Sequence, residues 1–309
     1  MSADLTEPLN CNRLLSLDGG GIRGVFTLEI LARMEGLLRT RYAMPTLVLA
    51  DYFNFIGGTS TGAIIAGFLA RGASIEEIQR LYLDMAPRIF EPIKGWSTIR
   101  HKFPSKPLAD ELKGFFHEPG DPEDLMTLGS ESLRTFLMLV VRNGSTGSAW
   151  PLTNNPNAPY NQGKGTTPSN LDLPLWQLIR ASAAAPTYFP SEMINVPTRD
   201  GDSMEFEFID GGVSPYLNPA LAMYLHATLP EYGLNLASGM DKMLLVSVGT
   251  GDVPPLHKPG KFSNINRIGG ALRTLKSVMS SAREQQDLMC RVLGRCLSGE
   301  PMDRELGAL

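Results

Sequence analysis

The chain has 309 residues, of which 43% are hydrophobic and 19% are charged, and its formal net charge is -4. This composition supports a large buried core and excludes an intrinsically disordered chain. The chain also lacks the basic excess of a dedicated nucleic-acid-binding domain, so we expect no DNA or RNA duplex as a partner.

Cysteine usage and the N-terminal residues indicate a reducing compartment. The three cysteines, Cys11, Cys290 and Cys296, are too few and too scattered for a disulfide framework. Residues 1–10 lack the apolar centre of a signal peptide, and no stretch approaches the ~18 apolar residues of a membrane-spanning helix. We therefore expect a single cytoplasmic domain over residues 1–309 that meets membranes only at their surface.

The first third of the chain alternates strand, Gly-rich turn and helix. This alternation is typical of a parallel α/β sheet. In chain order the pattern predicts strand 13–17, turn 18–21, helix 25–39, strand 51–56, turn 57–62 and helix 63–70.

Prolines and small residues divide the rest of the chain. A capped helix begins at Ser74 and should end before Pro87, and the proline-rich residues 91–123 predict a cap of short helices and loops laid over the sheet. Residues 143–170 predict a long structureless loop, a type that is usually functional. The other predicted elements are strand 133–141, helix 173–185, strand 206–209, helix 220–229, strand 243–248 and a helical region over 264–297.

Residues 58–62 read G-T-S-T-G, the G-x-S-x-G pattern of a nucleophile elbow. The glycines permit a strained turn between strand and helix, which leaves the serine hydroxyl exposed at a helix N-terminus. The positive end of the helix dipole there favours a developing alkoxide. The motif predicts Ser60 as a nucleophile.

A second Gly-rich turn, D-G-G-G-I-R-G at residues 18–24, lacks the spacing of both the dinucleotide-binding loop and the P-loop. One reading is a plain tight turn. The other is an oxyanion hole, in which the N-H groups of Gly19, Gly20 and Gly21 converge on a developing negative charge and Arg23 adds positive potential.

Asp210-Gly211-Gly212 follows a predicted strand, at the end where α/β sheets place their sites. The histidines stand in no recognisable catalytic setting; they are His101, His117, His226 and His257. An ordinary α/β-hydrolase in which His226 or His257 completes a Ser-Asp-His order is the mechanistic alternative.

Four blocks, D-G-G-G-I-R-G, G-T-S-T-G, A-S-A-A-A-P-T-Y-F-P at 181–190 and D-G-G, occur in the order and approximate spacing of patatin-like phospholipases. The similarity covers residues 12–230. It implies a three-layer α/β/α fold with a mostly parallel central sheet, related to the catalytic domain of cytosolic phospholipase A2. It also implies Ser60 as nucleophile, Asp210 as its base, and an oxyanion hole of Gly19, Gly20 and Gly21 supported by Arg23. Residues 181–190 would pack beside the site without direct chemistry.

The resemblance implies a lipid acyl hydrolase that cleaves fatty-acyl esters of membrane phospholipids, with no cofactor or metal and no need for calcium. An acyltransferase or a general esterase or thioesterase with the same dyad is an alternative. A regulatory lipid- or nucleotide-binding protein on this scaffold is an alternative from another class. Head-group preference, acyl-chain length and oligomeric state are left open. A homo-oligomer is one of the open alternatives.

Residues 253–283 contain six basic side chains and no Asp or Glu, which leaves the remaining chain at about -10. This asymmetry predicts a surface that binds an anion. The tail, residues 287–309, is similar to bacterial patatin-like effectors of nucleotide-signalling antiviral defence. This similarity implies a cyclic oligonucleotide activator bound by Lys258, Lys261, Arg267 and Arg273.

Basic and aromatic side chains alternate over residues 93–106, where no acid is present. Side chains of this kind suit an anionic membrane surface. The segment, with Trp96 and Phe103, is predicted to dock on lipid.

Overall fold

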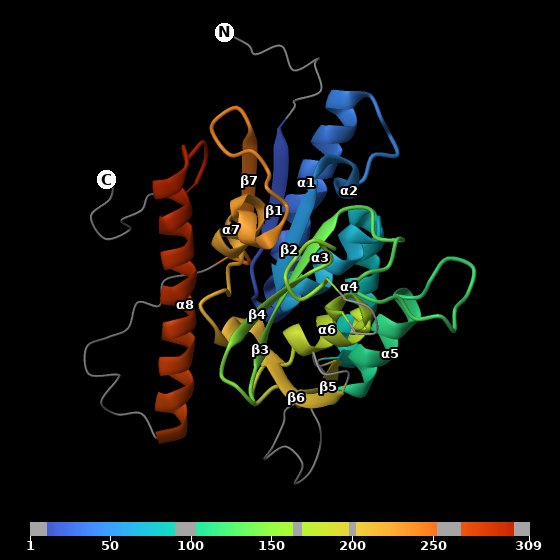
Figure 1. The fold of residues 1–309 in the computed structure, drawn as a ribbon, viewed down its shortest axis with the longest axis vertical. Coiled ribbons are helices and arrows are strands. Elements are labelled where there is room, and N and C mark those ends of the chain that lie inside the picture. The colour runs from blue at the N-terminus through green and yellow to red at the C-terminus, as the bar shows by residue number, and fades with distance from the viewer. Residues whose placement is uncertain (1–10, 90–102, 163–168, 198–201, 252–266, 300–309) are drawn as a thin grey trace.

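A seven-stranded sheet with helices on both faces forms the centre of the computed structural model (Figure 1). The structure describes residues 11–89, 103–162, 169–197, 202–251 and 267–299. Its strands are β1 (Asn12–Leu17), β2 (Phe55–Thr59), β3 (Phe136–Asn143), β4 (Ala149–Thr153), β5 (Glu192–Pro197), β6 (Ser203–Asp210) and β7 (Met243–Val248).

The strand order is β5-β6-β3-β2-β1-β7, with β4 also paired to β3. Strands β3, β2, β1 and β7 run parallel, whereas β4, β5 and β6 are joined by antiparallel pairings. The parallel strands need crossover connections, which the helices provide. The helices are α1 (Gly24–Tyr42), α2 (Leu49–Tyr52), α3 (Thr61–Ala70), α4 (Ile75–Ile89), α5 (Lys106–Phe115), α6 (Leu175–Ser182), α7 (Ala220–Thr228) and α8 (Arg267–Leu293).

Side chains alternate across the sheet and form a core on each face. On β1, Leu15 and Leu17 belong to the larger core, which includes Phe68 of α3, while Leu14 belongs to a smaller core with Met223 of α7. Helix α8 packs on α7, outside the smaller core (Figure 1). The structure therefore confirms the predicted three-layer α/β/α fold with a largely parallel centre.

The predicted strand over 51–56 and the turn over 57–62 are wrong in their boundaries. Asp51 instead caps the short helix α2, where its carboxylate accepts a hydrogen bond from the Val48 N-H at 3.0 Å. Strand β2 then includes Gly57 and Gly58. Both faces of this strand are covered, and Met223 occupies the space where a Gly57 side chain would lie. These glycines are core residues of a parallel strand rather than part of a turn.

Helix α4 runs to Ile89 and does not end before Pro87. A proline in the last turn removes the hydrogen bond to the carbonyl four residues earlier, which belongs here to Leu83. Leu83 is exposed, so water can satisfy that carbonyl, and the helix tolerates the proline.

The predicted structureless loop over 143–170 contains a strand, β4, which pairs with β3. Trp150 of β4 packs edge-on against Phe206 and Phe208 of β6, with ring centroids 5.6 and 5.3 Å apart. These aromatic contacts between distant segments stabilise a strand that local composition disfavours.

The predicted cap over 91–123 is described only from residue 103. There α5 packs against α4 and α6 in the helical layer. The predicted helical region over 264–297 corresponds to α8, and its residues 264–266 lie outside the described residues. No helix in the described part of the chain is both long enough and apolar enough to cross a membrane.

Candidate active site

Ser60 stands at the sharp turn between β2 and α3. Its backbone has φ 57° and ψ -123°, a left-handed conformation that is rare outside glycine. A side chain on Gly58 would collide with the Gly62 backbone, and one on Gly62 would collide with the Leu17 carbonyl. The two motif glycines therefore let strand, turn and helix approach closely enough to hold Ser60 in this strained conformation.

The Ser60 hydroxyl points to a carboxylate 150 residues later in the chain. Its Oγ donates a hydrogen bond to Asp210 Oδ2 at 2.6 Å, while Asp210 Oδ1 accepts one from the Gly212 N-H at 2.6 Å. Burial raises the pKa of Asp210 to about 6, although the two hydrogen bonds lower it. The carboxylate is thus oriented on both oxygens and more basic than an exposed aspartate.

Residues 181–190 fix both partners through their backbones. Ser182 Oγ accepts a hydrogen bond from the Ser60 N-H at 2.9 Å and donates one to the Val140 carbonyl at 2.6 Å. The Asp210 N-H donates to the Ala184 carbonyl at 3.0 Å. The sequence predicts only packing for this block, whereas in the structure it links the backbones of Ser60 and Asp210.

The Gly-rich loop lies beside Ser60, but its three glycines are not equivalent. A Cβ placed on Gly19 would lie 3.1 Å from Ser60 Cβ. The Gly19 N-H is already engaged, because it donates to the Leu217 carbonyl at 3.0 Å. Among the described residues, the N-H groups of Gly20 and Gly21 have no protein acceptor. The loop can therefore offer these two donors.

Arg23 contacts the loop that follows β7. Its guanidinium donates a hydrogen bond at 2.8 Å to the carbonyl of Gly251, just beyond β7. This contact ties the N-terminal end of α1 to the adjacent strand.

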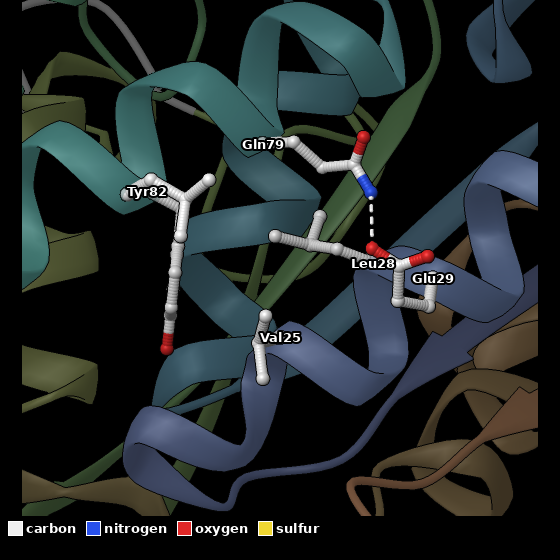
Figure 2. Close-up of a pocket in the computed structure, with 6 residues that line it drawn as sticks. Val25, Leu28, Glu29, Gln79 and Tyr82 are labelled. Atoms are coloured by element: carbon white, nitrogen blue, oxygen red, sulfur yellow. Dashed lines mark hydrogen bonds between the residues drawn. The ribbon is translucent and has the colours of Figure 1, made fainter.

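Tyr82 of α4 contacts the Gly-rich loop. The sequence predicts no role for this residue at the site. Its hydroxyl donates to the Gly21 carbonyl at 2.9 Å and lies 3.1 Å from Thr61 Oγ1. Burial raises the pKa of this phenol. Figure 2 shows the ring standing between α4 and α1. A tyrosine at a helical core position carries no sequence signal for such a role.

Helix α8 lies against the other side of the site. The methyl group of Met279 is 3.1 Å from where a Gly212 side chain would begin. Asp18, the first residue of the Gly-rich loop, is 4% exposed, and burial raises its pKa to about 8, with Arg283 lowering and Asp287 raising it. Asp18 is therefore within electrostatic reach of two charged side chains of α8 at the edge of the Gly-rich loop.

The histidines do not complete a triad within the described residues. His226 is buried on α7 and stacks on Tyr232 with ring centroids 3.7 Å apart, and burial lowers its pKa to about 4. Asp210 already uses both oxygens without it. His101 and His257 lie outside the described residues.

The predicted effector residues are only partly described. Lys258 and Lys261 lie outside the described residues, and Arg267 and Arg273 are described only as backbone positions of α8. In the part of the chain that the structure covers, no three His, Cys, Asp or Glu side chains gather where they could hold a metal ion.

The chain has relatives among known proteins and protein families. The model of the family "Patatin-like phospholipase" matches residues 15–224. Patatin-17 from Solanum cardiophyllum is 30% identical over 257 residues, which are 79% of this chain and 62% of that protein. A "probable inactive patatin-3-Kuras 1" from Solanum tuberosum is 30% identical over 250 residues, 77% of this chain and 62% of that protein.

A solved structure, VipD from Legionella pneumophila, aligns over 94% of this chain and 57% of its own, with 14% identity and a TM-score of 0.38. The chain spans about three fifths of the length of the patatins that it matches. The family model covers more than half of the chain and contains both Ser60 and Asp210. The chain therefore belongs to the patatin-like phospholipase family.

Proposed function

We propose that this protein is a serine lipid acyl hydrolase that cleaves fatty-acyl esters of membrane phospholipids with a Ser60–Asp210 dyad. One observation carries the proposal: Ser60 Oγ, in a strained elbow, lies 2.6 Å from a buried carboxylate. Family membership alone would not suffice, since one of the related patatins is named as probably inactive. The intact pair of nucleophile and base is what favours turnover here.

In the first half of the reaction, Asp210 Oδ2 takes the proton of Ser60 as Oγ attacks the ester carbonyl carbon. The carbonyl oxygen becomes an oxyanion, which the Gly20 and Gly21 N-H groups stabilise, with the Thr61 N-H at the start of α3 as a further donor. The tetrahedral intermediate collapses, and the leaving alcohol receives the proton from Asp210. Ser60 is left acylated.

In the second half, water replaces the alcohol. Asp210 takes a proton from the water as its oxygen attacks the acyl carbon, and the same donors stabilise the oxyanion. Collapse returns the proton to Ser60 Oγ and releases the fatty acid. No step uses a metal or a cofactor, so we expect turnover without calcium.

Two alternatives use the same scaffold. An acyltransferase would pass the acyl group from Ser60 to an alcohol or thiol instead of water. Adding glycerol to the reaction and analysing the products separates the two outcomes. A regulatory binding protein would have no need of a base hydrogen-bonded to an elbow serine, and its Ser60 would not react with a fluorophosphonate.

Hydrolysis should depend on both members of the dyad. Ser60→Ala should reduce release of fatty acid and lysophospholipid from vesicles to background, measured by mass spectrometry. Asp210→Asn, which keeps the shape but removes the base, should lower the rate by about 10²- to 10⁴-fold. The double variant should lose little more, because the two groups act as one unit. Stoichiometric fluorophosphonate labelling at a residue other than Ser60 would overturn the assignment.

The rate should follow the ionisation of Asp210. A base must be deprotonated, so kcat/KM on a soluble short-chain ester should be level from about pH 6 up to the pKa of Asp18 at about 8, and should fall about tenfold per unit below pH 6. Asp18→Asn is the matched control, since Asp18 makes no contact with Ser60, and it should keep the inflection near pH 6. An inflection near pH 4, or one that Asp18→Asn removes, would contradict the role of Asp210.

Tyr82 should act as a positioning residue. Tyr82→Phe leaves the Gly21 carbonyl without its donor, and a neutral hydrogen bond is worth about 1 kcal/mol. We expect about a fivefold fall in kcat and in the fluorophosphonate labelling rate, with KM little changed. Tyr42→Phe, which alters a ring packed against Tyr52, should leave both rates as they are. Equal effects of the two variants would argue against a role for the loop contact.

Access to the dyad is narrow. Ser60 and Asp210 are 8% and 3% exposed, and α8 lies close to Gly212 through Met279. We propose that a cyclic oligonucleotide, bound by the basic residues that lead into and begin α8, moves this helix and opens the site.

Replacing Lys258, Lys261, Arg267 and Arg273 by Ala should then abolish activation. Ser60 should keep its basal reactivity toward a small fluorophosphonate, because the substitutions lie outside the dyad. Calorimetry with cyclic di- and trinucleotides and vesicle hydrolysis measure the two halves of this prediction. Full hydrolysis without any nucleotide, together with no detectable binding, would end the proposal.

A further inference from the structure

The solvent side of α1 carries a row of large apolar side chains. These are Ile22, Phe26, Ile30 and Leu37, which are 57%, 58%, 50% and 53% exposed. Intervals of four and seven residues return to the same side of a helix. The four side chains therefore form one ridge, which begins just before α1 and follows its outer face. Single apolar side chains are ordinary on a surface, but several on one side of a helix are typical of an interaction site.

The ridge extends sideways onto α4. Leu83 of α4 is 62% exposed, and a shallow pocket lies between the two helices. This pocket is lined by Val25, Leu28, Glu29, Gln79, Tyr82 and Leu83 (Figure 2). We call Ile22, Phe26, Ile30 and Leu37, together with Leu83, the apolar ridge.

On α1 the exposed charge beside the apolar ridge is mainly basic, whereas α4 exposes both acidic and basic side chains. Arg33 and Arg41 are exposed at helical spacing from the ridge residues. Of the two acids on α1, Glu29 accepts a hydrogen bond from α4 at 2.9 Å, and Glu35 is buried 2.7 Å from Arg39. The α1 part of this face therefore combines apolar side chains with positive charge.

The apolar ridge begins at the candidate active site. Ile22 directly follows Gly21, one of the two loop glycines with a free N-H, and the loop packs against Ser60. Tyr82 lines the pocket beside the apolar ridge, and its hydroxyl donates a hydrogen bond to the same loop. A surface held against the start of α1 would thus lie beside the entrance to Ser60.

The segment predicted to dock on lipid, residues 93–106, is described only from residue 103. Phe103 is 6% exposed and packs on Phe189 with ring centroids 5.5 Å apart. The prediction that the Phe103 side chain meets lipid is therefore wrong. Trp96 lies outside the described residues.

We infer that the apolar ridge is the surface by which this protein docks on an anionic lipid bilayer, an inference that rests on the proposed phospholipase function. The apolar side chains would enter the boundary between head groups and acyl chains, and Arg33 and Arg41 would meet anionic head groups. Docking in this orientation brings the Gly-rich loop and Ser60 to the bilayer that holds their substrate.

The test begins with binding alone, measured in a Ser60→Ala background so that the lipid stays intact. Cosedimentation with vesicles of phosphatidylcholine and phosphatidylglycerol should be roughly tenfold weaker for each ridge side chain removed, hence about a hundredfold for Phe26→Ser with Ile30→Ser. Met193→Ser with Met204→Ser, which removes two exposed side chains from β5 and β6, is the matched control and should bind as the parent does.

The second part of the test removes positive charge beside the apolar ridge. Arg33→Gln with Arg41→Gln should weaken binding to vesicles with phosphatidylglycerol by about fivefold per charge, and added salt should reduce the difference. Binding to pure phosphatidylcholine should change little. Equal losses on both kinds of vesicle would contradict the electrostatic half of the inference.

Activity separates this inference from the proposed function. With Ser60 restored, Phe26→Ser with Ile30→Ser should slow hydrolysis of vesicles and leave that of a soluble short-chain ester unchanged. Weakened vesicle binding in a protein that hydrolyses neither substrate, with or without cyclic di- and trinucleotides, would uphold docking and overturn the hydrolase. Unchanged vesicle binding would overturn docking, and a simultaneous change of mass in light scattering would assign the ridge to contacts between copies.

Discussion

The buried hydrogen bond between Ser60 and Asp210 is the interaction that the neighbouring segments hold in place. It joins the end of a central parallel strand to the end of an antiparallel one, and both groups are almost removed from solvent. A carboxylate in such a place has lost most of its hydration, which is unfavourable unless its oxygens are paired. Ser60 and the Gly212 N-H satisfy one oxygen each, so the geometry that orients the base also permits its burial.

Two strained or close-packed features follow from this contact. Ser60 must adopt a left-handed backbone to reach Asp210, and Gly58 and Gly62 leave the necessary space. Ser182 then holds the strained residue by its N-H and joins it to β3 through the Val140 carbonyl. The strain at one residue is thus offset by hydrogen bonds from two other segments, as is common at sites that must be rigid.

The sequence locates the residues that meet at the candidate site better than the elements that carry them. Ser60, Asp210 and the Gly-rich loop stand in short motifs whose physical requirements are local, and β1, α7 and β7 follow from hydrophobic pattern. Gly57 was assigned to a turn because local propensity cannot reveal that Met223 covers it from another segment. Trp150 likewise belongs to a strand only through aromatic contacts across the sheet. Ser182 and Tyr82 act on the site through contacts that no spacing rule predicts.

The same limit applies to the oxyanion donors and to Arg23. Three consecutive glycines look alike in sequence, yet the Leu217 carbonyl takes the N-H of Gly19 and leaves those of Gly20 and Gly21. Arg23 has a positive charge that suits an anion, and its guanidinium also donates a hydrogen bond to the Gly251 carbonyl. In both cases the hydrogen-bond acceptor is a backbone carbonyl far away in the sequence, which local sequence does not reveal.

The burial of Asp18 makes the stability of the fold depend on pH. In the unfolded chain this carboxyl would be ionised at neutral pH, whereas in the folded protein its pKa is about 8. Folding near pH 7 therefore takes up about one proton at this position. Because the folded pKa is the higher one, the stabilising contribution is complete below about pH 4 and is lost as the pH rises through 8. The Gly-rich loop thus rests on a neutral acid, and alkaline conditions would place a buried charge between that loop and α8.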